Sequence, residues 1–199
     1  MPQNHLYILT GASRGMGLAM AQQLLCSGNT LICIARSAND DLAAEARAAG
    51  VAIEQWQQDL SQGEQAAHKL QAWLQAQGPQ AFASATLINN AGMIPRIAPL
   101  SASDVDDLAT ALRVGLEAPM QLTAAFLGAT DAWTVPRKVL NISSGLGRRA
   151  MASQAAYCAA KAGMDHFTRC VALDEALKPH GAKVCSLAPG VIDTDMQVQ

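Results

Sequence analysis

Aromatic and charged residues are scarce in this 199-residue chain: 4% of its residues are Phe, Trp or Tyr, and 15% are Asp, Glu, Lys or Arg. Its 14 basic and 16 acidic residues leave a net charge of -2, which excludes the concentrated positive face of a nucleic-acid or polybasic membrane binder. No stretch reaches the ~18 consecutive apolar residues of a membrane span. Half of the residues are nevertheless apolar, a composition that folds.

Paired cysteine spacings are also lacking. The five cysteines include no C-x-x-C pair, and the four histidines are widely scattered, so we expect no metal site. Buried, reduced thiols are favoured over a disulfide framework. The amino terminus has no basic segment typical of a signal peptide, and we expect a cytoplasmic protein. The cysteines are Cys26, Cys33, Cys158, Cys170 and Cys185.

Short apolar runs alternate with longer helical patterns along the chain. This alternation predicts parallel strands, right-handed crossovers and helices on both faces of the sheet. The predicted fold is an α/β, doubly wound, Rossmann-like sheet in a single domain, residues 1–199, with ligands at the carboxyl ends of the strands. We expect strands over residues 6–9, 31–35, 51–56, 83–88, 139–142 and 183–187, and helices over 15–26, 41–49, 61–75, 103–127 and 153–177.

Three glycines follow the first predicted strand with the spacing Gly-x-x-x-Gly-x-Gly. Gly11 permits a tight turn, Gly15 lets the backbone approach a pyrophosphate, and Gly17 allows close contact between helix and sheet. The next helix presents its free N–H groups and positive dipole end to an anion. Glycines also punctuate ordinary turns, so the position between strand and helix carries the prediction of a dinucleotide site, which includes Ser13, Arg14 and Met16.

The residues after the second strand favour a phosphorylated cofactor. An NAD site places an acid there to hold the ribose 2′-hydroxyl. Here the strand ends in Ala35-Arg36-Ser37, and the first acid is Asp40. Arg36 and Arg14 can clamp a 2′-phosphate, although two solvated arginines would leave the same pattern. We predict NADP(H) rather than NAD(H).

One of the two tyrosines stands four residues before a lysine. Tyr157 and Lys161 therefore share a helix face. A nearby ammonium lowers the pKa of a phenol from its usual ~10 and fits it for proton exchange. Ser144, after the fifth strand, can hold a substrate carbonyl oxygen beside Tyr157. Ser143 is the nearest alternative, and Ser-Ser-Gly also occurs as a plain turn.

In their order and spacing these motifs resemble the short-chain dehydrogenase/reductase family over nearly the whole chain. Residues 188–197 look like the branch of sepiapterin reductase and benzil reductase, whose members reduce carbonyls with NADPH. The matching motifs are Thr10-Gly11-x-x-x-Gly15-x-Gly17, Asp59-Leu60, Asn89-Asn90-Ala91-Gly92, Ser144, Tyr157-x-x-x-Lys161 and Pro189-Gly190.

The resemblance implies an NADPH-dependent carbonyl reductase that transfers the pro-S hydride. It implies that Tyr157 is the general acid, that Ser144 orients the carbonyl, and that Lys161 holds the nicotinamide ribose. It also implies a homodimer through the fourth and fifth helices. The further cofactor contacts it implies are Asp59 and Leu60 at the adenine, Asn89, Asn90, Ala91 and Gly92 along the inner path, and Pro189, Gly190, Val191, Ile192 and Thr194 over the nicotinamide.

The substrate is expected to be a small carbonyl compound. In this family the pocket walls come from the segments matching residues 93–100 and 146–151. Met93, Ile94, Leu146 and Met151 suggest an apolar or aromatic carbonyl.

The sequence departs from the family pattern in two places. Gly115 stands where the family usually has an asparagine that props a water leading protons to the lysine. The sequence also stops at Gln199, before the substrate-covering segment and seventh strand that family members commonly have, which predicts an exposed sixth strand and an open pocket. Either the protein is short or a tail continues beyond this sequence. A non-catalytic dinucleotide sensor or scaffold is therefore the alternative hypothesis, and NAD-dependent alcohol oxidation, which Arg36 argues against, is a third.

Overall fold

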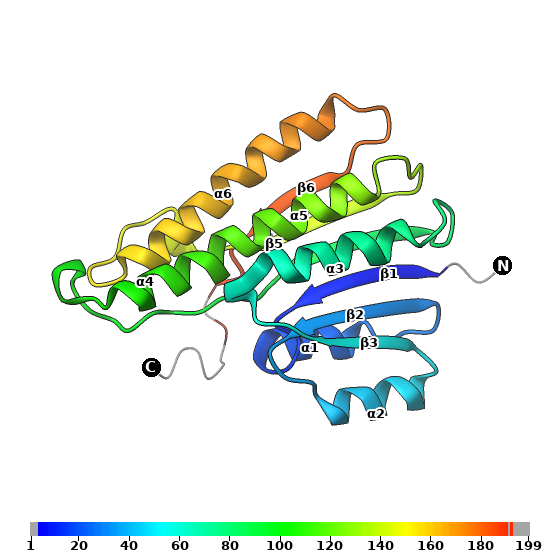
Figure 1. The fold of residues 1–199 in the computed structure, drawn as a ribbon, viewed down its shortest axis with the longest axis horizontal. Helices are drawn as coiled ribbons and strands as arrows, with labels where there is room; N and C mark the ends of the chain where they lie inside the picture. Colours follow the sequence, from blue (N-terminus) through cyan, green and yellow to red (C-terminus); the bar gives the residue numbers. More distant parts are fainter. Residues whose placement is uncertain (1–3, 191, 193–199) are drawn as a thin grey trace.

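The computed structural model describes residues 4–190 and 192, which form one parallel sheet of six strands in the order β3-β2-β1-β4-β5-β6 (Figure 1). The chain starts in the middle of the sheet, proceeds to one edge, and returns to place β4 on the other side of β1. The order reverses between β1 and β4. The strands are β1 (His5–Thr10), β2 (Asn29–Ala35), β3 (Ala52–Gln57), β4 (Ser84–Asn89), β5 (Arg137–Ile142) and β6 (Lys183–Leu187).

Helices cover both faces of the sheet, as the alternating sequence pattern predicts. In Figure 1, α3, α4, α5 and α6 lie on one face, and α1 and α2 lie on the other. The helices are α1 (Gly15–Gln23), α2 (Asp40–Ala49), α3 (Gly63–Gln75), α4 (Val105–Leu112), α5 (Ala118–Ala129) and α6 (Ala155–Ala176). Short helical turns are η1 (Leu60–Gln62), η2 (Leu100–Ala102), η3 (Arg113–Glu117) and η4 (Gly145–Gly147). The prediction of a doubly wound α/β sheet is confirmed.

Two apolar cores hold the layers together, one on each face of the sheet. Leu70 of α3 and Phe126 of α5 belong to the larger core and are fully buried. Leu31 of β2 and Leu42 of α2 belong to the core on the opposite face. Burial of this kind on both sides is what makes parallel strands read as continuous apolar runs.

The predicted helix over residues 103–127 is interrupted by η3, a turn of π-helix in which Ala118 donates its N–H to the Arg113 carbonyl. Pro119 explains the interruption, because it has no N–H with which to bond the Gly115 carbonyl four residues earlier. Gly115 is buried, and a Cβ on it would lie 3.1 Å from the Cβ of Ala160. The position where the family has an asparagine is thus filled by a close approach of η3 to α6.

The prediction of buried thiols is wrong for three of the five cysteines. Cys33 is buried, which raises its pKa to about 12, and Cys158 is partly buried. Cys26, Cys170 and Cys185 are exposed. Cys185 points away from α6 on β6, on the sheet face where α1 and α2 cover β1 to β3, and Leu187 beside it is 50% exposed. Within residues 4–190 and 192, no three His, Cys, Asp or Glu side chains gather as a metal site would require.

An aromatic cluster joins β3, α3 and the segments that enter β4 and β5. Trp56 meets Trp73 edge to face, Trp73 stacks on Phe82, and Phe82 stacks on Trp133, with ring centroids 6.1–6.4 Å apart. The carboxylate of Glu54 accepts the indole N–H of Trp56 at 2.8 Å and that of Trp73 at 3.0 Å. Four of the eight aromatic residues of the chain thus lie in one cluster.

The described helices include none that is both long enough and apolar enough to cross a membrane.

Candidate active site

The sequence motifs gather at the carboxyl ends of the strands. β1 ends at Thr10 and β4 at Asn89, which are neighbours where the strand order reverses. β5 leads directly to Ser144, and β6 leads to Pro189. Open α/β sheets bind their ligands in the crevice at this point. The candidate site therefore lies among the loops that follow β1, β4 and β5.

The glycines shape the loop after β1. Gly11 and Gly15 have φ values of 72° and 55°, which favour glycine. A Cβ on Gly17 would overlap the carbonyl oxygen of Gly11 and come within 2.6 Å of Nδ2 of Asn90. The loop, α1 and the segment after β4 therefore touch at a position that admits no side chain.

Helix α1 begins at this loop without a side-chain cap. Its N-cap residue, Arg14, makes no capping hydrogen bond, and its first turn contains no acid. Asn39 caps α2 and Asp104 caps α4, whereas α3, α5 and α6 also begin without a side-chain cap. The first N–H groups of α1 thus lack a side-chain partner at the positive end of the helix dipole. An uncapped helix end over a glycine cradle fits a pyrophosphate group.

Thr10 ties the first loop to the loop after β4, a role that the sequence analysis did not assign. Its hydroxyl accepts the N–H groups of Asn90 and Ala91, each at 2.9 Å. Nδ2 of Asn90 donates back to the Thr10 carbonyl at 2.9 Å. Gly92 follows, and a Cβ there would lie 3.6 Å from Nζ of Lys161. The segment predicted to line the inner side of the cofactor thus extends from the glycine loop to Lys161.

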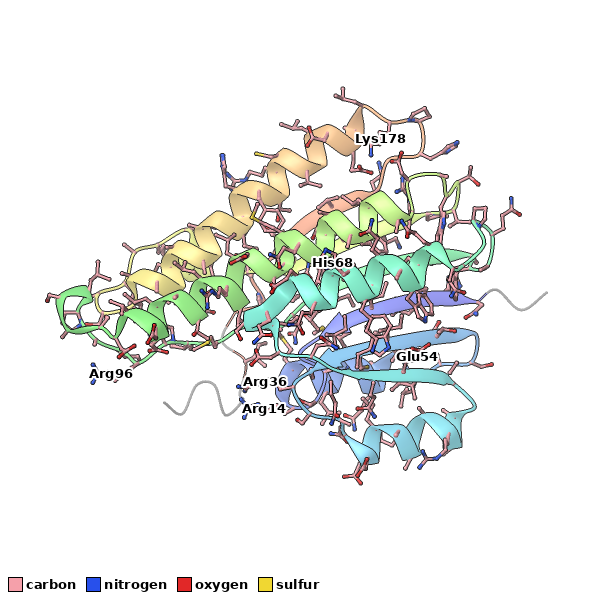
Figure 2. All side chains as sticks on the ribbon, in the orientation of Figure 1. Arg14, Arg36, Glu54, His68, Arg96 and Lys178 are labelled. Carbon is pink, nitrogen blue, oxygen red and sulfur yellow. The ribbon has the colours of Figure 1, made fainter. Side chains whose placement is uncertain are left out.

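Two arginines lie at the same end of the sheet. Figure 2 shows the exposed side chains of Arg14 and Arg36 at this end, on segments that follow the adjacent strands β1 and β2. Asp59 accepts the Ser61 N–H at 2.9 Å. This bond holds the pKa of Asp59 below its usual range, and the charge of Arg36 adds to the effect. Leu60 beside it is buried in the core.

Asn39 was not singled out in the sequence, yet it joins the second loop to the first. Its side-chain amide donates to the Ser13 carbonyl at 3.1 Å, while its oxygen caps α2. An Asn before a helix signals a cap. The hydrogen bond from Asn39 to the Ser13 carbonyl depends on how two separate loops pack together, which the sequence does not reveal.

The structure brings Ser144, Tyr157 and Lys161 close together. Ser144 accepts the Leu146 N–H at 3.2 Å, which fixes the start of η4, and it is hydrogen-bonded to Tyr157. Nζ of Lys161 lies 5.7 Å from the centroid of the Tyr157 ring. Ser143, the alternative to Ser144, is buried and turned toward Asp165. The geometry thus places Ser144, not Ser143, beside the phenol.

Contrary to the expectation from the sequence, the pKa of the Tyr157 phenol is not lowered below its usual value. Burial raises the pKa of Tyr157 above its usual value, and the bond with Ser144 opposes this only in part. Nζ of Lys161 donates instead to the Ile142 carbonyl at 2.7 Å. Burial lowers the pKa of Lys161 to about 8, while the charge of Asp165 acts in the opposite direction. At neutral pH the site thus holds a protonated phenol beside an ammonium group.

The expected substrate walls lie on two loops that meet. The Ala98 N–H donates to the Ser153 carbonyl at 3.3 Å, which joins the loop after β4 to the segment before α6. Met93, Ile94 and Leu146 are half-buried there, whereas Met151 is 55% exposed.

The predicted nicotinamide cover is described only in part. Pro189 and Ile192 are half-buried, and Gly190 has a φ of 87°. Val191 and Thr194 lie outside the described residues. The predicted contacts at those two positions therefore stay predictions.

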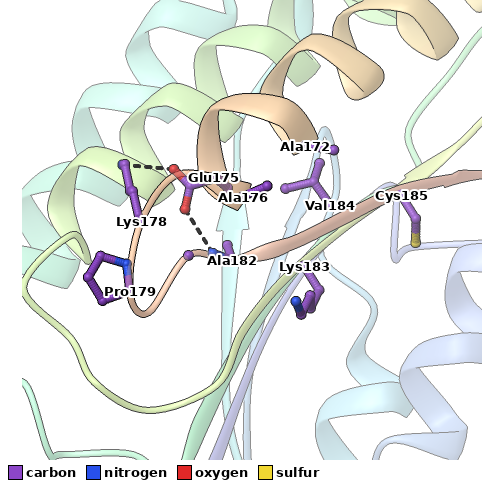
Figure 3. Close-up of a pocket in the computed structure, with 10 residues that line it drawn as sticks. Ala172, Glu175, Ala176, Lys178, Pro179, Ala182, Lys183, Val184 and Cys185 are labelled. Atoms are coloured by element: carbon purple, nitrogen blue, oxygen red, sulfur yellow. Dashed lines mark hydrogen bonds and ion pairs between the residues drawn. The ribbon is translucent and has the colours of Figure 1, made fainter.

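A hollow of about 260 Å³ lies elsewhere, between the end of α6 and the start of β6 (Figure 3). Its wall includes Glu175, whose carboxylate accepts the Ala182 N–H and the Lys178 ammonium group, each at 2.8 Å. Because it lies at the amino end of β6, it is separate from the loops that hold Ser144 and Tyr157.

The fold and this edge of the sheet define a dinucleotide-binding type of oxidoreductase, and sequence comparison agrees. Residues 5–199 match the family model described as short chain dehydrogenase. The chain therefore belongs to the short-chain dehydrogenase/reductase family.

Several relatives and solved structures resemble the chain over most of its length. Benzil reductase ((S)-benzoin forming) of Bacillus cereus is 36% identical over 192 residues, which are 96% of this chain and 77% of that protein. Sepiapterin reductase of Xenopus tropicalis is 33% identical over 210 residues, covering 97% and 76%. These matches place the chain in the branch that its last residues resemble.

Among solved structures, a 3-oxoacyl-[acyl-carrier protein] reductase from Brucella melitensis in complex with NAD superposes with a TM-score of 0.85 at 28% identity, over 100% of this chain and 78% of that one. A metagenomic short-chain oxidoreductase in complex with NADP gives 0.82 at 30% identity, over 96% and 83%. The family thus supports a nicotinamide dinucleotide cofactor.

Proposed function

We propose that this protein is an NADPH-dependent carbonyl reductase acting on a ketone or dicarbonyl, and that residues 1–199 form a single domain working in the cytoplasm. The observation that carries the proposal is the grouping of Ser144, Tyr157 and Lys161 at the carboxyl ends of the strands. The names of the benzil and sepiapterin reductases support a carbonyl substrate. The test is NADPH oxidation, followed by loss of near-ultraviolet absorbance, against aromatic diketones, quinones and pteridine ketones.

The glycine loop and the uncapped end of α1 would hold the pyrophosphate, and Arg14 and Arg36 the 2′-phosphate. When bound, the dinucleotide supplies the hydride that reduces the carbonyl carbon. Further proposed contacts are Ser13, Met16, Asp59, Leu60, Asn90, Ala91, Gly92, Pro189, Gly190, Val191, Ile192 and Thr194.

In the proposed mechanism Ser144 and Tyr157 donate hydrogen bonds to the carbonyl oxygen. The O–H bond of Tyr157 breaks as its proton passes to that oxygen, and a phenolate remains. The raised pKa of Tyr157 keeps the phenol protonated until the substrate oxygen becomes basic. The Lys161 ammonium group, 5.7 Å from the ring centroid, stabilises the phenolate until it regains a proton from solvent.

Reductive kcat/KM is expected to be level around neutral pH and to fall as the pH rises through about 8. Below that value Lys161 is charged; above it the ammonium group loses its proton and no longer stabilises the phenolate. kcat/KM reports groups of the free enzyme, so the fall should approach tenfold per pH unit. A level profile up to pH ~9.5 would contradict this role for Lys161, and tryptophan fluorescence at each pH distinguishes the fall from unfolding.

Arg36→Glu is expected to reverse the preference between NADPH and NADH. Loss of a charge-assisted hydrogen bond worth about 1.5–3 kcal/mol, plus repulsion of the 2′-phosphate, should raise KM for NADPH at least about tenfold. KM for NADH should change little. Arg47→Glu, at an exposed arginine in the last turn of α2, is the matched control. An unchanged ratio of the two KM values would remove the support for NADP(H).

We also propose a homodimer through α4, α5 and α6. Val105, Met120 and Leu173 on these helices are 75%, 47% and 71% exposed, which suits a second copy of the chain. Light scattering should then give twice the 20.8 kDa mass of one chain.

A further inference from the structure

Asp165 is a buried carboxylate that the proposed mechanism does not use. It lies on α6 one turn after Lys161, and only 4% of its surface is exposed. An acid is rarely buried in this way unless cations or hydrogen-bond donors surround it. Its partners therefore indicate what it does.

Residues from three segments besides α6 surround the Asp165 carboxylate. Nε of Arg148, in the loop after η4, donates to Oδ2 at 3.0 Å. Ser143, just after β5, and Ser186, in β6, lie close to the carboxylate. The Ser143 hydroxyl and Oδ1 of Asp165 have no hydrogen-bond partner among the described residues. The Ser143 N–H bonds the Leu187 carbonyl at 2.7 Å, so β5 and β6 are joined at the same level. Asp165 thus ties the loop after η4 to α6 and lies beside the ends of β5 and β6.

The fastened loop is the one that carries Ser144. Gly147 lies directly on the backbone of Lys161, because a Cβ there would come within 2.9 Å of its carbonyl carbon and oxygen. The next residue, Arg148, makes the ion pair with Asp165. Adjacent residues of the loop therefore press it against α6 on the turn that bears Lys161, just after Ser144 begins η4.

The same carboxylate acts on Lys161 through its charge. The Lys161 side chain is buried, which disfavours the ammonium form, and Asp165 favours it. Arg148 from the loop and Tyr157 from α6 are the titratable groups that the described residues place against this pair. β5 and β6 contribute the two serine hydroxyls and the Ile142 carbonyl. η3 contributes Gly115, packed on Ala160, and no charge.

We propose that Asp165 is a positioning residue that holds the Ser144 loop against α6 and keeps a negative charge beside Lys161. It does not exchange a proton with substrate, since its oxygens face Arg148 and the two serines. The inference rests on the proposed reductase function. Because the Arg148 side chain is 52% exposed, its ion pair with Asp165 adds little to the free energy of unfolding of the whole protein. The expected effect is therefore on the position of the loop.

The test compares Asp165→Asn with Asp165→Glu in the full chain. In Asp165→Asn the alkaline fall of reductive kcat/KM should move about one pH unit lower, as expected for removing a charge one turn away. In Asp165→Glu, which keeps the charge, the fall should stay near its wild-type pH even if kcat drops. Asp174→Asn is the matched control, because that acid is exposed on the same helix about 14 Å beyond Asp165.

A second readout does not depend on turnover. Protein carrying lysine labelled with ¹³C at Cε reports the titration of Lys161 by NMR, with the signal assigned by its loss in Lys161→Met. In Asp165→Asn this titration should also move to lower pH. If wild type reduces no carbonyl of the panel, the proposed function fails, while the NMR titration still decides the charge effect. Unchanged titration and an unchanged pH profile in Asp165→Asn would overturn the inference.

Arg148→Met tests the position of the Ser144 loop independently of the charge on Asp165. It also decides the proposal if Asp165→Asn does not fold. With the carboxylate intact, the alkaline fall should not move to lower pH. kcat should drop about tenfold, because Ser144 loses its fixed position. Wild-type kcat in Arg148→Met would show that the ion pair does not hold the loop.

Discussion

Tyr157→Phe is expected to lower kcat for carbonyl reduction by about 10² to 10⁴-fold, the usual contribution of a positioned proton donor. The change removes one hydroxyl from a half-buried ring and leaves the glycine loop untouched, so NADPH affinity should stay within about twofold of wild type, a change of only ~0.4 kcal/mol. Tyr7→Phe is the matched control, because Tyr7 is the other tyrosine of the chain and lies half-buried in β1. The measurement is NADPH oxidation beside an NADPH titration.

The outcome also separates the two main hypotheses. If Tyr157→Phe turns over like wild type, Tyr157 is not the general acid. If wild type binds NADPH tightly and reduces no carbonyl on the panel, the sensor or scaffold hypothesis takes precedence. Gly115 would then be the first position to consider, because it lacks the amide that the family uses near the lysine.

Gly17→Ala is expected to abolish dinucleotide binding or prevent folding. The new methyl group would overlap the Gly11 carbonyl oxygen and crowd Nδ2 of Asn90, and neither can withdraw without breaking the junction of α1 with the loops after β1 and β4. We expect NADPH affinity to fall at least about 100-fold, equivalent to about 2.7 kcal/mol. The measurements are calorimetric titration with NADPH and urea unfolding.

Gly128→Ala in α5 is the control for Gly17→Ala. No atom lies within 4 Å of a Cβ at Gly128, and the residue is exposed. The same substitution there should raise the free energy of unfolding by about 0.5–1 kcal/mol, because alanine favours a helix. Wild-type affinity in Gly17→Ala would contradict the idea that this loop packs as tightly as the structure indicates.

Most of the fold was predictable from the sequence because its signals are local. Apolar runs mark the strands, and glycines mark the turn after β1. Parallel crossovers then allow few arrangements. Spacing on one helix likewise brought Tyr157 and Lys161 together, and the end of β5 supplied Ser144.

The remaining features depend on contacts between distant segments. Whether Cys185 is exposed depends on how the helices are arranged around β6, and no local sequence pattern predicts that arrangement. Asp165 reads in sequence as one more charge on a helix, because its pairing with Arg148 exists only after the loop folds back. The raised pKa of Tyr157 likewise depends on the burial of its ring, which no local sequence pattern reveals. The π-turn at Gly115 did have a local signal in Pro119.

The aromatic cluster gives the protein an intrinsic fluorescence signal that comes from one part of the fold. All three tryptophans belong to it, so intrinsic emission reports the packing of β3, α3 and the starts of β4 and β5. None of these segments carries Ser144, Tyr157 or Lys161. Variants at those positions can therefore be followed through unfolding by a signal whose chromophores the substitutions leave in place. Glu54, which bonds two of the indoles, makes that signal sensitive to a single carboxylate.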